Sequence, residues 1–286
     1  MAINGIPNII GKRGGGVIRE DIVRVKDSEI KDTSGAPTEE WPEGTLIVNT
    51  AENRLYVRTK GSADTPSKLF LKFNESTGTT ASDSSGNSKD FTVTNGANWA
   101  AGKYDNAYDF NAVEKASIAG EAHFAISGAF CFECWAYCDE VGTAYYSFYS
   151  AHKDVNNYFL FGLSNAGGLY FEIKTAGASQ FLSLDISLTP FNQWAHYAVT
   201  RNATGITRTY INGDLVDTTA SITNDLSIDN TYTVYAGYDE AHDIYMTGLI
   251  DELKVWNTER QESEINNDLL NGDTALIWTY AKLRTA

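Results

Sequence analysis

The sequence predicts an all-β protein, in which a sandwich of two antiparallel sheets follows an extended N-terminal arm and a β-hairpin. Many short apolar runs are separated by turn residues, and no helical pattern of about 10–15 residues lies between them. Of the chain, 42% is hydrophobic and 12% is aromatic, which is enough to build a sizeable core. At 286 residues the chain has room for one large sandwich and a small appendage.

Two hairpins in the second half of the chain favour the sandwich. Residues 207–211 and 215–217 flank Asn212–Gly213, the kind of pair that a two-residue type I′ turn requires. Residues 158–163 and 169–174 flank a second turn in the same way. We expect the inward faces of the two sheets to bury four aromatic side chains between them, those of Phe110, Trp135, Trp194 and Trp256.

Residues 1–65 differ from the rest of the chain and are predicted to form an extended arm and a hairpin. Residues 17–26 alternate apolar and charged side chains as a half-buried strand does, and residues 33–44 hold the prolines and glycines of a loop. The runs 46–48 and 55–57 are separated by turn-forming residues and predict the hairpin. Because an isolated hairpin is marginally stable in water, we expect it to dock on the sandwich, on a neighbouring subunit or on a larger assembly.

The charge and hydropathy of the chain exclude two kinds of partner. The net charge is −15, and residues 66–286 carry most of it, with 13 Lys and Arg against 27 Asp and Glu. Such an acidic body repels phosphate backbones, so we expect no nucleic-acid partner. No apolar run approaches the about 20 residues of a membrane span, so we expect no membrane insertion. The N-terminus lacks the charged start and long apolar segment of a secretory signal peptide.

Three cysteines lie close together in the segment FCFECWAYC. In a strand, Cys134 and Cys138 share one face while Cys131 points to the other, so the three thiols do not converge on one metal ion without a bulge. No second Cys pair or His motif supplies a fourth ligand at a recognisable spacing. We therefore expect buried free thiols, which fit assembly in a reducing cytoplasm.

The segment GLIDELKVWNTERQESEI at residues 248–265 predicts a strand at residues 249–256, followed by a short helix. Together with further segments in the same order, it resembles the laminin-G-like, concanavalin A-like jelly-roll domains of pentraxin type over about residues 69–265. These further segments are residues 69–73, 81–91, 102–110, 127–136, 194–200, 208–216 and 235–237. The resemblance implies that residues 66–286 form one jelly-roll domain with a short C-terminal helix and tail.

Residues 44–60, GTLIVNTAENRLYVRTK, resemble short segments near the N-termini of bacteriophage tail-fibre and other virion-attachment proteins. This resemblance implies that the arm, residues 1–65, binds other virion proteins. It also implies a protein that is assembled in the host cytoplasm and located in the virion. Homo-oligomerisation is expected as well, because the symmetry of a virion presents identical sites.

The jelly-roll resemblance also implies a structural calcium ion, held between the loop at Asp83 and the strand at Asp251. Calcium binds six to eight oxygen ligands, and Asn87 is the expected third side chain of this site. A second interpretation needs no metal. In it, Asp83 caps its own turn through backbone amides, and Asp251 accepts hydrogen bonds from the same loop.

Two clusters of tyrosines and polar residues are candidate carbohydrate sites, because sugars stack on aromatic rings and bond to carboxylates and amides. One holds Tyr145, Tyr146 and Tyr149 beside residues 156–158, and the other holds Tyr238, Asp239 and Tyr245 beside His242. The alternative is that these rings pack the sandwich, since the chain has 16 Tyr in all.

The predicted function is that of a non-enzymatic bacteriophage virion structural protein (a fibre, spike or capsid decoration) whose exposed jelly roll binds host-surface glycans. Two alternatives stand beside it, a bacterial carbohydrate-binding or adhesive lectin-like module and a glycoside hydrolase on the same fold. The hydrolases place paired acids along one strand in a Glu-x-Asp-x-x-Glu pattern, which this sequence lacks. Strand alternation predicts that the adjacent Asp251 and Glu252 point to opposite faces and do not act together.

Overall fold

The protein forms two compact units in the computed structural model. One contains residues 64–265 and the other contains residues 1–63 with residues 266–286. The structure describes residues 30–32, 46–49, 54–60, 65–94, 96–111, 113–139, 146–164, 168–183, 190–219, 221–271 and 276–282. Within these ranges, no helix has the length and apolar character needed to cross a membrane.

The smaller unit contains a four-stranded sheet with the order β1-β2-β3-β22. Its strands are β1 (Ile30–Asp32), β2 (Leu46–Asn49), β3 (Arg54–Lys60) and β22 (Leu276–Lys282). The predicted hairpin is confirmed, since β2 and β3 pair antiparallel with Leu46 opposite Val57. The strand expected at residues 17–26 and the loop at residues 33–44 lie outside the described residues.

The C-terminal tail differs from the prediction, which placed it with the jelly roll. Strand β22 pairs antiparallel with β3, with Leu276 opposite Lys60, so residues 266–286 group with residues 1–63. The physical reason is that a two-stranded hairpin needs further strands to be stable, and β22 and β1 supply one on each side.

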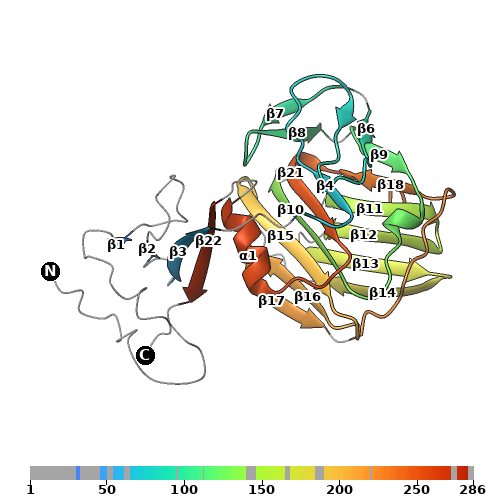
Figure 1. Cartoon of the computed structure of the whole chain (residues 1–286). Helices are drawn as coiled ribbons and strands as arrows, with labels where there is room; N and C mark the ends of the chain where they lie inside the picture. The colour runs from blue at the N-terminus through green and yellow to red at the C-terminus, as the bar shows by residue number, and fades with distance from the viewer. Residues whose placement is uncertain are drawn as a thin grey trace. The chain divides into compact units, whose positions relative to one another are not determined.

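The larger unit is a sandwich of two antiparallel sheets, which confirms the predicted fold class (Figure 1). Sheet I has the order β17-β16-β15-β10-β21-β8-β7, and β4 also pairs with β21. Its strands are β4 (Leu69–Leu71), β7 (Trp99–Ala101), β8 (Asn106–Asn111), β10 (Phe130–Cys138), β15 (Trp194–Arg201), β16 (Thr207–Ile211), β17 (Asp214–Thr219) and β21 (Thr247–Trp256).

Sheet II has the order β14-β13-β12-β11-β18-β9-β6-β5. Its strands are β5 (Thr80–Ala81), β6 (Phe91–Val93), β9 (Ala116–Ala119), β11 (Tyr146–Asp154), β12 (Asn157–Leu163), β13 (Leu169–Thr175), β14 (Ala178–Ser183) and β18 (Thr233–Ala236). A 3-10 helix, η3 (Ala122–Phe124), precedes β10, and a small hairpin of β19 (Tyr238–Asp239) and β20 (Ile244–Tyr245) follows β18.

The short helix predicted after the closing strand is also present, as α1 (Glu262–Asn271). The side chain of Glu264 accepts the backbone N–H of Gln261 at 2.6 Å, so a carboxylate caps the start of the helix. Ile265 is fully buried in a small apolar cluster with Ala198 and Tyr210 of sheet I. This contact fastens the segment that follows β21 to the outer face of the sheet.

The core lies between the sheets and is dominated by aromatic rings. The ring of Phe132 in sheet I lies 5.3 Å from Tyr149 and 5.4 Å from Phe159 in sheet II, measured between centroids. Phe110 belongs to this core, as predicted, but the three tryptophans do not. Trp256 instead donates its indole N–H at 2.8 Å to the buried carboxylate of Glu133, on the outer face of sheet I. The outer face thus gives the indole N–H of Trp256 a polar partner, which the apolar core does not offer.

The cysteines behave as strand alternation predicts. All three are free thiols and are buried. Cys134 and Cys138 belong to the core between the sheets, whereas Cys131 pairs with Thr200 and Trp256 across sheet I and is not part of that core.

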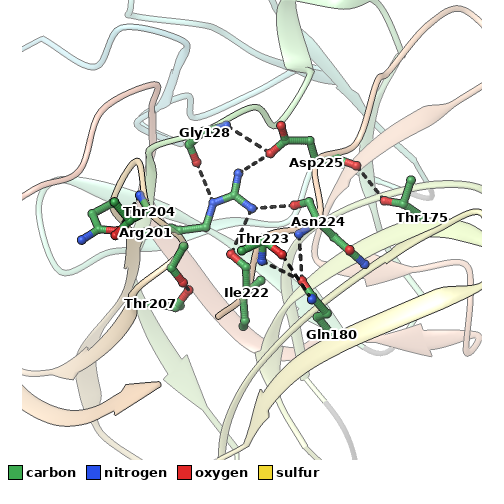
Figure 2. Close-up of polar contacts among 12 residues, drawn as sticks. Gly128, Thr175, Gln180, Arg201, Thr204, Thr207, Ile222, Thr223, Asn224 and Asp225 are labelled. Atoms are coloured by element: carbon green, nitrogen blue, oxygen red, sulfur yellow. Dashed lines mark hydrogen bonds and ion pairs between the residues drawn. The ribbon is translucent and has the colours of Figure 1, made fainter. Parts of the chain in front are cut away.

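Arg201, at the end of β15, ties sheet I to the edge of sheet II (Figure 2). Its guanidinium donates to the carbonyl oxygens of Gly128 at 2.6 Å and Asn224 at 2.5 Å, and to the carboxylate of Asp225 at 2.6 Å. The same loop bonds to β14, because Gln180 accepts the backbone N–H of Asn224 at 2.8 Å. The loop at residues 221–226 therefore holds β14 in place, and β14 carries part of the site described next.

Candidate functional site

The candidate site lies on the outer face of sheet II, near its β14 edge. Strand alternation sends Phe159 and Phe171 into the core, so their neighbours Tyr158 and Glu172 face outward. Glu172 stands in the middle of β13, directly opposite Phe181 of the edge strand β14. This arrangement brings a carboxylate and an aromatic ring side by side at the margin of the sandwich.

Glu172 is only 7% exposed, and a carboxylate in such a place needs hydrogen-bond donors. Three hydroxyl groups supply them. Tyr158 donates to Oε1 at 3.0 Å, Tyr170 donates to Oε2 at 2.8 Å, and Ser179 donates to Oε1 at 2.5 Å. Burial, with the nearby Glu172 carboxylate, raises the pKa of Tyr158 well above its ordinary range, so this phenol stays protonated and continues to donate.

Phe181 is the accessible aromatic residue of this face. It is 61% exposed, which is unusual for a phenylalanine. Its ring lies near that of Tyr170, with centroids 6.2 Å apart and planes inclined by 28°. A flat ring open to solvent beside hydroxyl and carboxylate oxygens is the combination that a sugar ring requires, with one face for stacking and an edge for hydrogen bonds.

The β19–β20 hairpin bounds the site on the side away from β14. The Nδ1 atom of His242 lies 2.6 Å from a carboxylate oxygen of the fully buried Asp239, and this hydrogen bond raises the pKa of His242 above its ordinary value. The imidazole meets the ring of Tyr158 edge-on, with centroids 5.4 Å apart. Ser150 donates to the carbonyl oxygen of Tyr238 at 2.7 Å and so joins the hairpin to β11.

These contacts form a continuous row across sheet II, which we call the sheet II strip. It consists of His242, Tyr158, Glu172, Tyr170, Ser179 and Phe181. Its accessible members are His242, Ser179 and Phe181, while Tyr158 and Glu172 are buried beneath them. The strip therefore has a rigid hydrogen-bonded base and an open aromatic edge.

The first predicted carbohydrate cluster is corrected by the structure. Tyr146 is 2% exposed and Tyr149 is 1% exposed, and both belong to the core between the sheets, so neither ring can stack on a sugar. Tyr145 lies outside the described residues. Alternation along β11 turns Tyr146 and Phe148 inward, and a shift of register between Ser147 and Tyr149 turns Tyr149 inward as well, beside Phe132.

The second predicted cluster lies beside the strip. Tyr238 and Tyr245 face each other across the hairpin with ring centroids 4.4 Å apart, and the ammonium of Lys115 lies 4.2 Å from the centre of the Tyr238 ring. Tyr238 is 6% exposed, so it serves the packing of the hairpin rather than a stacking surface. Asp239 acts through His242, which it orients toward Tyr158.

The loop proposed for calcium is internally hydrogen-bonded. One oxygen of Asp83 accepts the backbone N–H groups of Phe70 at 3.0 Å and Ser85 at 2.9 Å, and the other accepts the N–H of Lys89 at 3.0 Å. Asn87 donates its side-chain amide to the hydroxyl of Ser85 at 2.9 Å. Among the described residues, no three His, Cys, Asp or Glu side chains group closely enough to hold a metal ion. The geometry matches the metal-free turn, and calcium stays a prediction.

Asp251 is fully buried and accepts the backbone N–H of Tyr104 at 2.8 Å, not an N–H of the Asp83 loop. Burial, with the nearby charge of Glu252, raises the pKa of Asp251 to about 8.

The prediction that Asp251 and Glu252 face opposite sides of the strand is wrong. Glu252 has a φ of 52° where the register between β10 and β21 shifts, and its carboxylate lies 3.4 Å from the ammonium of Lys254. This bulge places both acids on the outer face of sheet I.

The two-sheet antiparallel sandwich is a jelly roll of the concanavalin A-like type, and the comparison with protein families agrees. Residues 110–266, more than half of the chain, match the concanavalin A-like lectin/glucanases superfamily. The chain belongs to this superfamily. A search of curated protein sequences found no match.

Solved structures with similar folds include domain 4 of AbnA, a GH43 extracellular arabinanase from Geobacillus stearothermophilus, in complex with arabinotriose. Its TM-score is 0.55 at 20% identity, over 71% of this chain and 98% of that one. The receptor-binding domain of botulinum neurotoxin mosaic serotype C/D has a TM-score of 0.58 at 18% identity, over 73% of this chain and 51% of that one. The ligand-binding domain of serotype D, in complex with N-acetylneuraminic acid, has a TM-score of 0.55 at 20% identity, over 70% and 50%. The chain thus spans about half of the toxin domains.

Sequence reasoning missed Glu172, Tyr170, Ser179 and Phe181. One signal was present for Glu172, a carboxylate inside the otherwise apolar strand LYFEIKT. Such a residue needs a hydrogen-bonding or charged partner. Phe181 carried no signal of its own, because its exposure depends on the position of β14 at the edge of sheet II.

Proposed function

We propose that the jelly roll is a non-enzymatic glycan-binding module whose site is the sheet II strip, and that the chain is a bacteriophage virion protein which displays it as a fibre, spike or capsid decoration. One observation carries the glycan site. An exposed phenylalanine lies opposite a buried carboxylate that three hydroxyl groups hold in place. Single exposed apolar side chains are common on protein surfaces and need no functional explanation. A fully hydrogen-bonded buried carboxylate beneath one of them does need one.

Ligands of proteins with similar folds support the proposal. The arabinanase domain was crystallised with arabinotriose and a botulinum serotype D domain with N-acetylneuraminic acid, and botulinum neurotoxin type C entry depends on two ganglioside molecules. Sugar ligands are thus named for three proteins of similar fold, although their sequences are at most 20% identical to this chain.

The virion role rests on the smaller unit. The β2–β3 hairpin coincides with the segment at residues 44–60 that resembles attachment segments of phage fibres. It belongs to a compact unit separate from the jelly roll, so one part can bind the particle while the other contacts a cell. Mass spectrometry of purified particles, with immunogold labelling of the full chain, tests this role. Absence of the chain from intact particles would refute it.

A glycan array probed with the full chain tests the glycan site. We expect Phe181→Ala to weaken binding at least about tenfold, because it removes the stacking surface. The matched control is Leu215→Ala, which truncates another exposed apolar residue, 45% exposed, on the edge strand β17 of the other sheet. Equal binding by the parent chain and Phe181→Ala would place the glycan site elsewhere.

The non-enzymatic character is tested with the glycans that bind. The carboxylate of Glu172 already accepts three hydroxyl groups, which suits a fixed binding surface better than proton transfer. We expect no release of new reducing ends after prolonged incubation. Release that Glu172→Gln abolishes would instead identify a glycoside hydrolase.

A further inference from the structure

We infer that the sheet II strip selects glycans that present hydrogen-bond donors, namely neutral sugars and amino sugars, over sialylated or uronic-acid glycans. The inference rests on the proposed glycan site and adds the chemical class of its ligand. Three features of the strip carry it: the direction of its hydroxyl hydrogens, the charges around it and the placement of its exposed ring.

The first feature is that Glu172 determines the direction of the hydroxyl groups around it. A carboxylate only accepts hydrogen bonds, so each hydroxyl that contacts it must turn its single hydrogen inward. Ser179 is exposed, and its hydroxyl lies 2.5 Å from Glu172 Oε1. Its oxygen therefore faces solvent as an acceptor, and a ligand has to approach it with an O–H or N–H group.

The second feature is the charge around the strip. Glu172 is the buried carboxylate of the strip, Asp239 is buried next to His242, and Glu240 and Asp243 are exposed acids on the adjoining hairpin. The basic side chains that face these groups are His242, His152, Lys174 and Lys115, and His152 lies 3.5 Å from the carboxylate of Glu240. His242 is bonded to Asp239, and the ammonium groups of Lys174 and Lys115 lie over the rings of Tyr158 and Tyr238. The four carboxylates outnumber the two lysines, so an anionic sugar would meet hydrogen-bond acceptors and an excess of negative charge.

The third feature places the sugar. Phe181 and Ser179 are both exposed and lie two residues apart on β14, so their side chains share one face of the edge strand. A pyranose or furanose ring stacked on Phe181 has its hydroxyl groups at the rim, within reach of Ser179. A hydroxyl donates one hydrogen bond there, and the ammonium of an amino sugar donates a charge-assisted one toward the same acids.

The test is an array of matched glycans in three classes: neutral, amino-sugar, and sialylated or uronic. The parent chain is compared with Phe181→Ala, Ser179→Ala and Glu172→Gln, each first checked for unchanged thermal unfolding. We expect the parent to bind neutral or amino glycans at least about tenfold more tightly than acidic ones. Ser179→Ala should weaken this binding several-fold and leave the acidic class unchanged, because it removes one acceptor.

The variant Glu172→Gln should reverse the direction of one hydrogen bond in the strip. Its amide replaces one acceptor oxygen by an NH₂ donor, so a hydroxyl facing it must accept and turn its hydrogen toward the ligand. The preference for neutral over acidic glycans should then fall about tenfold. If this variant does not fold, Ser179→Ala and the parent still decide the question.

The outcomes separate the two proposals. Binding of neutral or amino glycans that Phe181→Ala removes supports both. A preference for acidic glycans that Phe181→Ala removes overturns the donor selectivity and keeps the glycan site. Binding that Phe181→Ala does not change, or no binding to any class, overturns the glycan site and the inference with it.

Discussion

The guanidinium of Arg201 is 1% exposed, yet it pairs at 2.6 Å with Asp225, whose side chain is 53% exposed. The pair crosses from the interior of the sandwich to its surface, and three carbonyl oxygens, those of Gly128, Ile222 and Asn224, complete the shell of the guanidinium (Figure 2). Burial lowers the pKa of Arg201, and the hydrogen bond with Asp225 opposes this shift. Arg201 therefore keeps its positive charge, because its hydrogen-bond partners are fixed. Since Arg201 is buried and Asp225 is exposed, replacing each residue should change the stability by a different amount.

Replacing the two residues should have unequal effects on the free energy of unfolding. Arg201→Lys leaves buried carbonyl oxygens without donors and should cost about 3 kcal/mol. Asp225→Asn keeps an acceptor for Arg201 at a site open to water and should cost about 1 kcal/mol. Urea unfolding of both variants measures the difference. Equal losses would mean that the exposed carboxylate, rather than the carbonyl shell, stabilises the buried charge.

Much of the sandwich could be predicted because its strands follow local rules. Asn212 and Gly213 have φ values of 50° and 77°, as the predicted type I′ turn requires, and β16 and β17 pair on either side of them. The cysteines alternate across β10 as the two-residue period demands. The bulge at Glu252 could not be predicted in this way. It depends on a left-handed backbone conformation that nothing in the residues around Asp251 requires.

The candidate site was predicted only in part, because its residues meet across strands. Asp239 and His242 lie three residues apart and the sequence places them in one cluster, whereas Glu172 accepts hydrogen bonds from Tyr158 and Ser179 on two neighbouring strands. Which strands neighbour β13 depends on the sheet order, and a single sequence does not state it. The inward turn of Tyr149 follows from the same strand register that the sequence leaves open.

The raised pKa of Asp251 predicts that the protein loses stability as the pH rises from about 4 to about 8. The ordinary pKa of this carboxyl group is 3.8 and the folded value is about 8. Between these values the native state holds a proton that the unfolded chain has released, so the free energy of unfolding falls by up to about 1.4 kcal/mol per pH unit. Above about pH 8 this contribution no longer changes.

Asp251→Asn isolates this effect, because the amide has the same shape and no charge. Lys103, whose pKa is lowered by burial, and Glu252 are the charged groups that also face this carboxyl group, and both are unchanged in the variant. We expect the difference in unfolding free energy between variant and parent to grow in favour of Asn from pH 4 to pH 8. Parallel curves over this range would contradict the buried, protonated carboxyl group.

Gly237 positions the hairpin that bounds the site, and its replacement should be severe. Its φ is 75°, and a Cβ atom there would lie 2.2 Å from two ring atoms of Phe110. Gly237→Ala should therefore cost about 3 kcal/mol or more, from backbone strain and from collision with the core. Gly86→Ala is the matched control, with a φ of 88° and no heavy atom within 4 Å, and should cost only about 1 kcal/mol. Similar costs would show that strain alone matters at both positions.

The bond between His242 and Asp239 predicts a titration that NMR can follow. His242 should titrate above its ordinary pKa of 6.5, and Asp239→Asn should bring it back toward that value, because the hydrogen bond to the carboxylate is the main cause of the shift. The nearby charges of Glu172 and Lys174 act in opposite directions on this pKa and stay in place in the variant.

The His242–Asp239 pair stabilises the fold fully below about pH 6.5, and this stabilisation is lost as the pH rises through the raised pKa of His242. An unshifted His242 in the parent chain would mean that the imidazole does not bond to Asp239 in solution.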